Sequence, residues 1–176
     1  PDALADFVDV FALGDGEELL LEVIDFIREW KQQGRGTRDE MLHRLSKIWG
    51  IYVPRFYEPR YNADGTIASI DPIGEGTPPR VVKRFVQELP PALTRPIVPF
   101  VQTVHDRMAI EIQRGCTQGC RFCQAGMIYR PRLERSPEEV LAVAQELART
   151  TGYDELSLVS LSTTDHSRIV EIVDKL

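Results

Sequence analysis

The first fifty residues change from a continuous apolar run to a helical repeat. Residues 7–13, Phe-Val-Asp-Val-Phe-Ala-Leu, form a short β-prone run that predicts a buried strand. Thr37 and Glu40 form a capping-box pattern that predicts a helix further along. Between these two signals, apolar residues recur every three or four positions and predict an amphipathic helix, whose stripe comprises Leu20, Val23, Ile24, Ile27 and Trp30. Residues 1–50 therefore predict a strand–turn–helix–helix unit that closes an open α/β domain.

Residues 51–105 lack this regularity. Two runs, 51–61 and 66–70, are typical of strands, and the Asn-Ala-Asp-Gly sequence at 62–65 is a hairpin turn signal between them. Most of the chain's twelve prolines also lie in this region. We interpret it as a proline-rich linker that contains a β-hairpin, with residues 81–89 as a further strand or short helix.

Residues 106–176 return to a regular alternation of strands and helices. Residues 109–112 predict a strand, Ser136 is a helix N-cap followed by proline and two glutamates, and Gly152 ends that helix. Residues 156–161 predict the next strand, and a second helix follows with the stripe Ile169, Val170, Ile172 and Val173. This order is the repeating unit of a parallel barrel or open sheet. Because ligands sit at the carboxyl ends of such strands, we expect the two loops that follow them to lie side by side.

The predicted fold class is α/β, in three parts. Residues 1–50 are predicted to close an open α/β domain, 51–105 to form the linker with a β-hairpin, and 106–176 to form the first β/α units of a parallel barrel or open sheet. The chain opens with Pro1 rather than Met and stops inside a helical pattern, so we expect a piece of a longer protein. A barrel of so few units leaves a strand edge unpaired, and we expect the piece by itself to be catalytically inactive.

Composition and charge exclude several classes of function. Of the 176 residues, 43% are hydrophobic and 27% are charged, which is typical of a globular protein in water. The formal net charge of −6 gives no electrostatic case for binding nucleic acid or a membrane surface. No apolar stretch approaches the roughly 20 residues of a membrane span, and no signal peptide is recognisable. The odd number of cysteines argues against a secreted disulfide framework, so the sequence favours the cytoplasm.

All three cysteines, Cys116, Cys120 and Cys123, lie in one short run with the spacing Cys-x3-Cys-x2-Cys. One loop can aim thiolates spaced in this way at a single point, and grouped thiolates suit iron–sulfur clusters or zinc. A cubane cluster has four irons, so three cysteines leave one iron without a protein ligand. Such an open iron can bind and activate a substrate, whereas a fully ligated cluster can only pass electrons.

Two other sites compete with this interpretation. A structural zinc site would need a fourth ligand, for which His105 and His166 are the candidates. A ferredoxin-like electron carrier would need a fourth cysteine, which this chain does not contain. The alternative to an enzyme is therefore a non-catalytic electron-transfer or structural zinc module.

The cysteine run resembles that of the radical S-adenosylmethionine superfamily. The resemblance rests on the spacing, on Phe122 directly before the last cysteine, and on the position after the first strand of a β/α unit, and it covers residues 96–176. It implies that Cys116, Cys120 and Cys123 hold a [4Fe–4S] cluster whose fourth iron chelates S-adenosylmethionine. The implied activity is reductive cleavage of that cofactor, which starts radical chemistry on an unknown substrate.

The resemblance also implies contacts for the cofactor and a source of electrons. Phe122 would contact the adenine, and the loop after the second strand would hold the amino group. Many members have a Gly-Gly-Glu type of sequence in that loop, whereas this chain has Ser-Leu-Ser-Thr-Thr-Asp, so the oxygen acceptors would be Ser162, Thr163 and Asp165. The electron would come from an external donor of the flavodoxin or ferredoxin type.

The turn after the first predicted strand carries a second resemblance. Its sequence, Gly-Asp-Gly-Glu-Glu at 14–18, resembles the last β/α unit of the cobalamin-binding domain that is fused to many radical S-adenosylmethionine enzymes. The whole chain is closest to an uncharacterised subgroup of this kind, in which Gly14 and Gly16 would let the backbone approach cobalamin. These resemblances imply that residues 1–50 are the C-terminal piece of a Rossmann-like (flavodoxin-like) domain and that residues 106–176 are the first β/α units of a partial TIM-type barrel. Glycine and acidic residues at a strand-to-helix turn are also good capping chemistry, because negative charge there meets the helix dipole. The sequence alone leaves both interpretations open.

Charged residues around the cysteine run have no settled role. Glu111 points into or out of a barrel depending on the register of its strand. Several arginines could balance the charge of a ligated cluster or lie in solvent, namely Arg114, Arg121, Arg130, Arg132 and Arg135.

Overall fold

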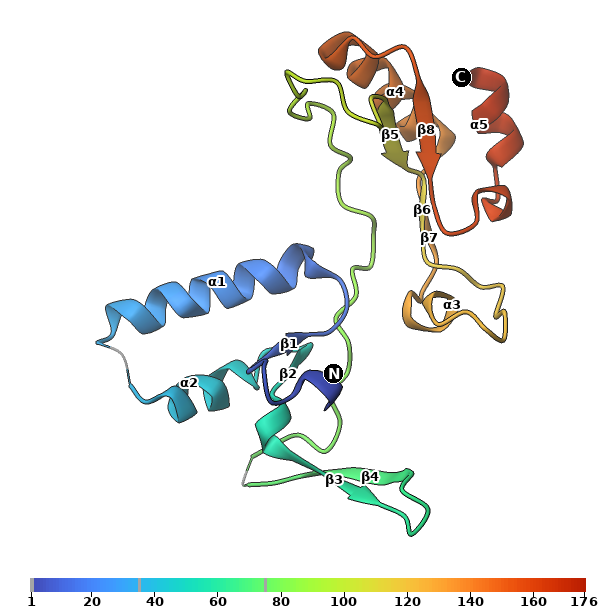
Figure 1. The fold of residues 1–176 in the computed structure, drawn as a ribbon. Coiled ribbons are helices and arrows are strands. Elements are labelled where there is room, and N and C mark those ends of the chain that lie inside the picture. Colours follow the sequence, from blue (N-terminus) through green and yellow to red (C-terminus); the bar gives the residue numbers. More distant parts are fainter. Residues whose placement is uncertain (1, 35, 75) are drawn as a thin grey trace. The chain divides into compact units, whose positions relative to one another are not determined.

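A computed structural model describes residues 2–34, 36–74 and 76–176. The chain divides into two compact units, one ending at Val86 and the other beginning at Gln87. This boundary falls inside the segment predicted as a linker. Figure 1 follows the chain through both units, and each is described here by itself.

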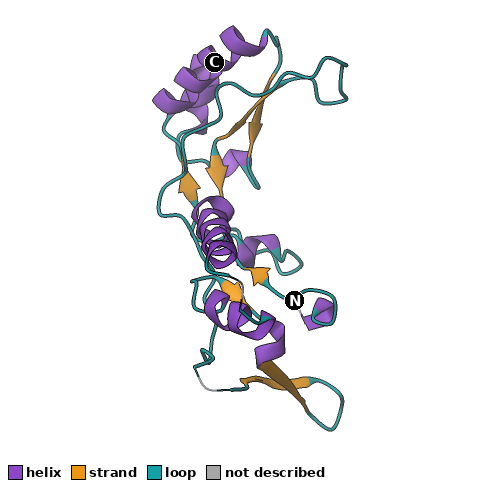
Figure 2. Ribbon diagram, turned by 90° about the vertical axis from the view of Figure 1, so that its left-hand side faces the viewer, coloured by secondary structure: helices purple, strands orange, loops and turns teal. Residues whose placement is uncertain are grey.

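The first unit is built from two helices and two short antiparallel sheets. After a 3₁₀ turn (Asp2–Leu4) come β1 (Phe11–Ala12), α1 (Gly16–Gln32) and α2 (Arg38–Leu45). Next are β2 (Ile51–Tyr52), a 3₁₀ turn (Pro54–Phe56), β3 (Tyr57–Tyr61) and β4 (Ile67–Pro72). β1 pairs with β2, and β3 pairs with β4 in the predicted hairpin, which is visible as a two-stranded ribbon in Figure 2.

Three features of the first unit differ from the sequence prediction. The predicted strand 7–13 is reduced to Phe11–Ala12, and Phe7 is 85% exposed. The predicted strand 51–61 is interrupted because Pro54 begins a 3₁₀ turn. Among the described residues of segment 81–89, the only β-pairing is a single parallel bridge between Gly14 and Arg84.

The buried face of α1 is also shifted from the predicted stripe. Leu19 is buried, whereas Leu20 and Ile24 are 60% and 43% exposed. The apolar residues of this helix span a broad face, so the neighbouring elements decide which of them are covered. The core that covers α1 comprises Leu19, Leu42, Leu45, Ile51, Val53 and Phe56.

The predicted capping box of α2 is confirmed. The Thr37 side chain accepts a hydrogen bond from the Glu40 backbone, and the Glu40 carboxylate accepts one from the Thr37 N–H at 2.7 Å. These two bonds satisfy donors that the start of a helix would otherwise leave unpaired.

The second unit has the predicted parallel β–loop–α–β–loop–α order. β5 (Met108–Glu111) pairs in parallel with β8 (Leu156–Val159), so that Glu111 lies opposite Val159. α4 (Pro137–Thr151) connects the two strands, and a 3₁₀ turn (Thr163–Asp165) leads to α5 (Ile169–Lys175). The predicted Ser136 N-cap is confirmed, because its hydroxyl accepts from the Glu139 N–H at 3.2 Å. The core comprises Met108, Ile110, Ile112, Val140, Val143, Leu147 and Ile172.

The α/β class is thus correct, while its Rossmann-like and barrel subdivisions stay predictions. Among the described residues, β5 and β8 are the pair of strands that run in parallel, and no helix there is long and apolar enough to cross a membrane.

Candidate functional site

The cysteines lie in a loop that a short antiparallel pair of strands closes. β6 (Gln113–Arg114) follows directly on β5, and β7 (Leu133–Glu134) pairs with it, so that residues 115–132 form the cysteine loop. The loop therefore leaves the sheet at the carboxyl end of β5, as expected. Figure 1 shows this pair leading into the short helix α3 (Ala125–Ile128) within the loop. Strands of two residues carry no periodicity, which is why the sequence did not predict them.

Glycine allows the base of the loop to close. Gly115 has φ +83°, and a Cβ there would lie 2.6 Å from the Tyr129 carbonyl oxygen and 2.8 Å from that of Pro131. The next residue, Cys116, donates its N–H to the same Tyr129 oxygen at 3.2 Å. The two ends of the loop thus pack backbone against backbone, which only a residue without a side chain permits.

All three cysteines are free thiols with different surroundings. Cys116 is buried, Cys120 is exposed, and Cys123 is intermediate and donates its N–H to the Cys120 carbonyl at 3.0 Å. Within 2–34, 36–74 and 76–176, no three or more His, Cys, Asp or Glu side chains gather closely enough to hold a metal ion. The donor set nevertheless fits a cluster in its chemistry, because three thiols that form no disulfide share one loop.

Phe122 is 92% exposed on this loop, between the second and third cysteine. Its ring is therefore accessible to a flat partner. Other apolar side chains of the loop are exposed as well, namely Met127, Ile128 and Tyr129. The cysteine loop thus presents both thiols and apolar surface.

The structure brings the loop after β8 next to the cysteine loop, which confirms the expected neighbourhood. Asp165 accepts a hydrogen bond on its carboxylate from Gln118 Nε2 at 2.7 Å and one on its carbonyl oxygen from Arg132 Nη1 at 2.9 Å. Hydrogen bonds from the Ser162 hydroxyl and from Gln118 lower the pKa of Asp165 below its ordinary value, so its carboxylate is charged at neutral pH. Thr163 Oγ1 lies 2.8 Å from Ser160 Oγ.

Sequence reasoning missed Gln118 and gave Arg132 no settled role. Gln118 is one of the unspecified positions of the cysteine motif, and its partner lies 47 residues further along the chain. A local pattern carries no signal for such a contact. The expected side-by-side placement of the two loops was the one indication that their polar residues would meet.

Three of the charged residues whose role the sequence left open bind other protein groups near the end of β5. Glu111 accepts from Arg114 Nε at 2.8 Å and from Arg114 Nη2 at 3.0 Å. Arg135 is buried, and its guanidinium donates to the carbonyl oxygens of Glu111 and Pro90 and to the Glu139 carboxylate. Arg135 therefore fastens the segment before β5 to the end of that strand.

His166 has the contacts of a packing residue. It is buried, its Nε2 lies 3.0 Å from the Arg135 carbonyl oxygen, and its Nδ1 accepts from the Arg168 N–H at 3.1 Å. A carbonyl oxygen can only accept, so the hydrogen is on Nε2. Both ring nitrogens are thus engaged, which disfavours His166 as a fourth zinc ligand.

Gly14 and Gly16 lie in the first unit, in different environments. Gly14 has φ +108°, and a Cβ there would lie 1.8 Å from the Arg84 carbonyl oxygen. Gly16 begins α1 and has no atom within 4 Å of such a Cβ. The acids of this turn also bind protein groups: Asp15 accepts from the Val86 N–H, and Glu18 pairs with Arg84. Close packing against Arg84 thus explains why position 14 is a glycine without any cofactor, while the cobalamin contact stays a prediction.

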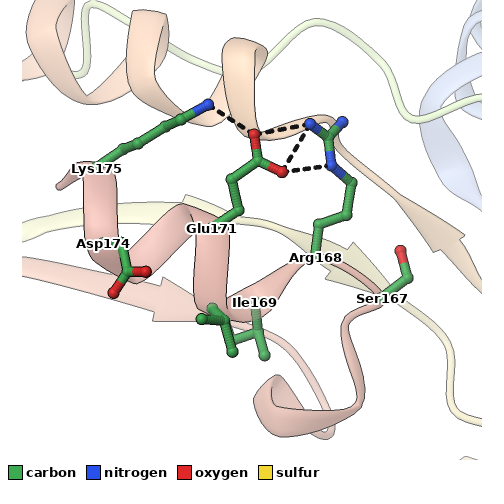
Figure 3. A pocket seen from close by; sticks show the side chains of 7 residues that line it. Ser167, Arg168, Ile169, Glu171, Asp174 and Lys175 are labelled. Carbon is green, nitrogen blue, oxygen red and sulfur yellow. Dashed lines mark hydrogen bonds and ion pairs between the residues drawn. The ribbon is translucent and has the colours of Figure 1, made fainter.

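A cavity of about 510 Å³ lies against α5. Figure 3 shows its charged wall, in which Glu171 accepts from Arg168 and from Lys175. None of the predicted site residues lines this cavity. It therefore adds nothing to the chemistry of the cysteine loop.

Comparisons with known proteins agree with the cysteine loop. Residues 110–176 match the family model "Radical SAM superfamily", and residues 1–54 match "Radical SAM proteins, N-terminal". Both matched segments of the chain are thus similar to radical S-adenosylmethionine proteins. The first of these segments contains all three cysteines and both loops. The description of the model that matches residues 1–54 names radical SAM proteins and does not mention cobalamin.

Curated relatives cover parts of the chain. The chain is 35% identical over 63 residues to an uncharacterised protein of Methanocaldococcus jannaschii, MJ0966. The matched segment covers 36% of this chain and 14% of the relative. The chain is 30% identical over 108 residues to the ribosomal protein uS12 methylthiotransferase RimO of Salinispora tropica, or 57% of this chain and 21% of the relative. RimO of Salinispora arenicola is 34% identical over 83 residues, with coverages of 47% and 16%. The chain thus spans less than a quarter of each relative, and no solved structure matches it.

Proposed function

We propose that the second unit binds a [4Fe–4S] cluster and S-adenosylmethionine, as part of an enzyme that cleaves the cofactor reductively and starts radical chemistry. The observation that carries this proposal is the superfamily match over residues 110–176, a segment that includes the loop with three free thiols after β5. Cys116, Cys120 and Cys123 would be the cluster ligands. When bound, the cluster supplies the electron and an open iron for the cofactor.

The protein's own residues bind and orient the cofactor in this proposal. Phe122, which is 92% exposed, would lie against the adenine. Ser162, Thr163 and Asp165 belong to the loop that touches the cysteine loop, and they would accept hydrogen bonds from the amino group. The charged Asp165 carboxylate suits an ammonium group, because opposite charges attract most strongly where water is partly excluded.

Several finer assignments are part of the same proposal. The two strands β5 and β8 would begin a partial TIM-type barrel, and an external flavodoxin- or ferredoxin-type protein would donate the electron in the reducing cytoplasm. The first unit would be the end of a Rossmann-like domain, in which cobalamin would approach Gly14 and Gly16. Similarity to RimO supports radical chemistry, while its ribosomal substrate is not carried over from a match to 21% of that protein.

Spectroscopy of the 176-residue chain tests the cluster and its open iron. The chain is reconstituted anaerobically with iron and sulfide and reduced, and its EPR spectrum is recorded with and without S-adenosylmethionine. We expect a [4Fe–4S] signal that changes when the cofactor is added, and no cluster in the variants Cys116→Ala, Cys120→Ala and Cys123→Ala. A signal indifferent to the cofactor would indicate an electron carrier, and bound zinc without a cluster would refute the proposal.

Cobalamin binding needs a separate measurement. The chain is mixed with hydroxocobalamin, and the visible spectrum and equilibrium dialysis report binding. We expect binding that weakens in Gly16→Val, because the added side chain would keep cobalamin away from the backbone. Gly16 has open space around it, so the substitution should not disturb its neighbours in the protein. The absence of binding to the unaltered chain would remove cobalamin from the proposal and leave the cluster untouched.

A further inference from the structure

Side chains of the cysteine loop and of the loop after β8 form a small network centred on Asp165. Gln118 Nε2 donates to the Asp165 carboxylate at 2.7 Å, and Arg132 Nη1 donates to its carbonyl oxygen at 2.9 Å. Gln118 comes from the first half of the cysteine loop and Arg132 from its end. We call these three residues the loop latch. Asp165 is therefore held by both halves of the loop that carries the thiols.

Gln118 connects this latch to one of the thiols. It lies between Cys116 and Cys120, and its backbone N–H faces Cys116 Sγ at a distance of 3.5 Å. One residue thus offers its backbone to a sulfur and its side chain to the neighbouring loop. A movement of Asp165 would pull on the same residue that sets the hydrogen bond to Cys116.

The position of the loop after β8 is fixed from its other side as well. Glu134 on β7 accepts from the Ser167 N–H at 2.9 Å and from the Ser167 hydroxyl at 2.5 Å. The buried His166 ring bonds the Arg135 carbonyl oxygen at 3.0 Å. Residues that follow Asp165 are thus anchored to β7 and its neighbour, and the Gln118 contact reaches further, into the interior of the cysteine loop.

We propose that Gln118 is a positioning residue that couples the thiol-bearing loop to the loop that takes the cofactor, through its hydrogen bond to Asp165. This inference rests on the proposed function and adds a coupling between its two halves. Hydrogen bonds to cluster sulfurs help to set the reduction potential. A contact that moves the Gln118 backbone therefore changes both the fit of the cofactor and the potential of the site.

One exchange of a nitrogen for an oxygen tests the latch. Gln118→Glu keeps the shape of the side chain but places a carboxylate against the Asp165 carboxylate, so the bond is replaced by repulsion. The double variant Gln118→Glu with Asp165→Asn restores a bond in the opposite direction, from the asparagine amide to the glutamate. Gln124→Glu is the matched control, since it adds the same charge in the same loop at an exposed side chain.

Two measurements separate this inference from the proposed function. Hydrogen–deuterium exchange on the chain without cluster reports whether residues 115–132 and 160–167 open together. On the reconstituted chain, EPR titration gives the S-adenosylmethionine concentration for half of the spectral change, and redox titration gives the midpoint potential. If the unaltered chain forms no cluster, the proposed function fails, while the exchange experiment still tests the latch.

We expect Gln118→Glu to speed exchange in both loops and to raise the half-saturating cofactor concentration by about tenfold, which is the usual size of coupling between two sites. The double variant should return exchange in both loops towards that of the unaltered chain. Gln124→Glu should leave exchange in the loop after β8 unchanged. Equal effects of Gln118→Glu and Gln124→Glu, or a double variant whose two loops exchange as fast as those of Gln118→Glu, would overturn the coupling.

Discussion

The turn between β1 and α1 and the loop between β6 and β7 are built in the same way but leave different groups for function. Each contains a positive-φ glycine whose missing side chain lets two backbones touch: Gly14 against Arg84, and Gly115 against Tyr129. In the first turn, Asp15 and Glu18 bind groups of the same unit. In the second, three thiols form no disulfide and Phe122 is 92% exposed.

This difference shows what a glycine-rich turn after a strand can and cannot indicate. Glycine there reports close packing of backbone, which both turns need whether or not a ligand binds. Function is indicated by side chains that the fold itself does not use. By that criterion the cysteine loop is a site, and the turn at Gly14 needs independent evidence of a ligand.

The largest expected effect is on the packing of Gly14. In Gly14→Ala, the new Cβ would lie 1.8 Å from the Arg84 carbonyl oxygen at a φ of +108°, so the turn must open. Strain of this kind and the lost contact should lower the free energy of unfolding by about 3 kcal/mol. Urea denaturation followed by circular dichroism measures this change.

Gly16→Ala is the matched control for that measurement. It makes the same substitution two residues later, where a Cβ would meet no atom within 4 Å. We expect it to be neutral or slightly stabilising, because alanine favours a helix more than glycine does. If both variants had the same stability, the packing account of Gly14 would be wrong, and a cofactor would become the better reason for that glycine.

Local signals predicted the parts of the fold that depend on a few neighbouring residues. The Thr37–Glu40 capping box, the Ser136 N-cap and the β3–β4 hairpin each follow from side-chain chemistry within four or five positions, and all are present. The parallel pairing of β5 with β8 also followed, because a helix between two strands favours that arrangement.

Features that depend on distant residues were not predictable in this way. The strand expected at 7–13 is short because its partner, Ile51–Tyr52, has only two residues before Pro54 turns the chain. The buried face of α1 was ambiguous because its apolar residues span a broad face, and the neighbouring elements decide which of them are covered. In the site, the sequence named the cysteines and the neighbouring loop, but the bond from Gln118 to Asp165 joins two ordinary polar residues far apart in the chain.

The second prediction concerns Gly115 and the reactivity of the thiols. In Gly115→Ala, a Cβ 2.6 Å from the Tyr129 carbonyl oxygen would push apart the two ends of the cysteine loop. That change should expose the buried Cys116, whose N–H bonds the same oxygen. Strain of 1–3 kcal/mol at such a position corresponds to an increase of about tenfold in the rate of Cys116 alkylation.

Alkylation with iodoacetamide, followed by peptide mass spectrometry, resolves the three thiols. The exposed Cys120 should react fastest in the unaltered chain and should change little in the variant. Gly119→Ala is the control within the loop, because the nearest atom to its Cβ would be the flexible end of Arg130 at 3.8 Å. A slow Cys116 in both variants would show that Gly115 does not hold the loop closed.

The smallest expected effect on stability comes from the ion pairs of Glu171 on α5, which do not depend on close packing of backbone. Hydrogen bonds from Arg168 and then from Lys175 lower the pKa of Glu171 from 4.5 to about 2. A carboxyl whose pKa is depressed by folding stabilises the folded state above its unfolded pKa, and this contribution is lost as the pH falls towards the folded value. Stability should therefore decline between about pH 4.5 and pH 2 from this source.

The decline should be slight, because the Glu171 side chain is 34% exposed and salt screens pairs that water reaches. Thermal unfolding at several pH values measures it, with Glu171→Gln expected to flatten that part of the profile. Asp174→Asn, on the same helix and in the same cavity wall, should leave the profile as it is. A slope that survived in Glu171→Gln would assign the acid sensitivity to other carboxylates. A loss as large as that of Gly14→Ala would mean that surface charge, rather than backbone packing, dominates the stability of this chain.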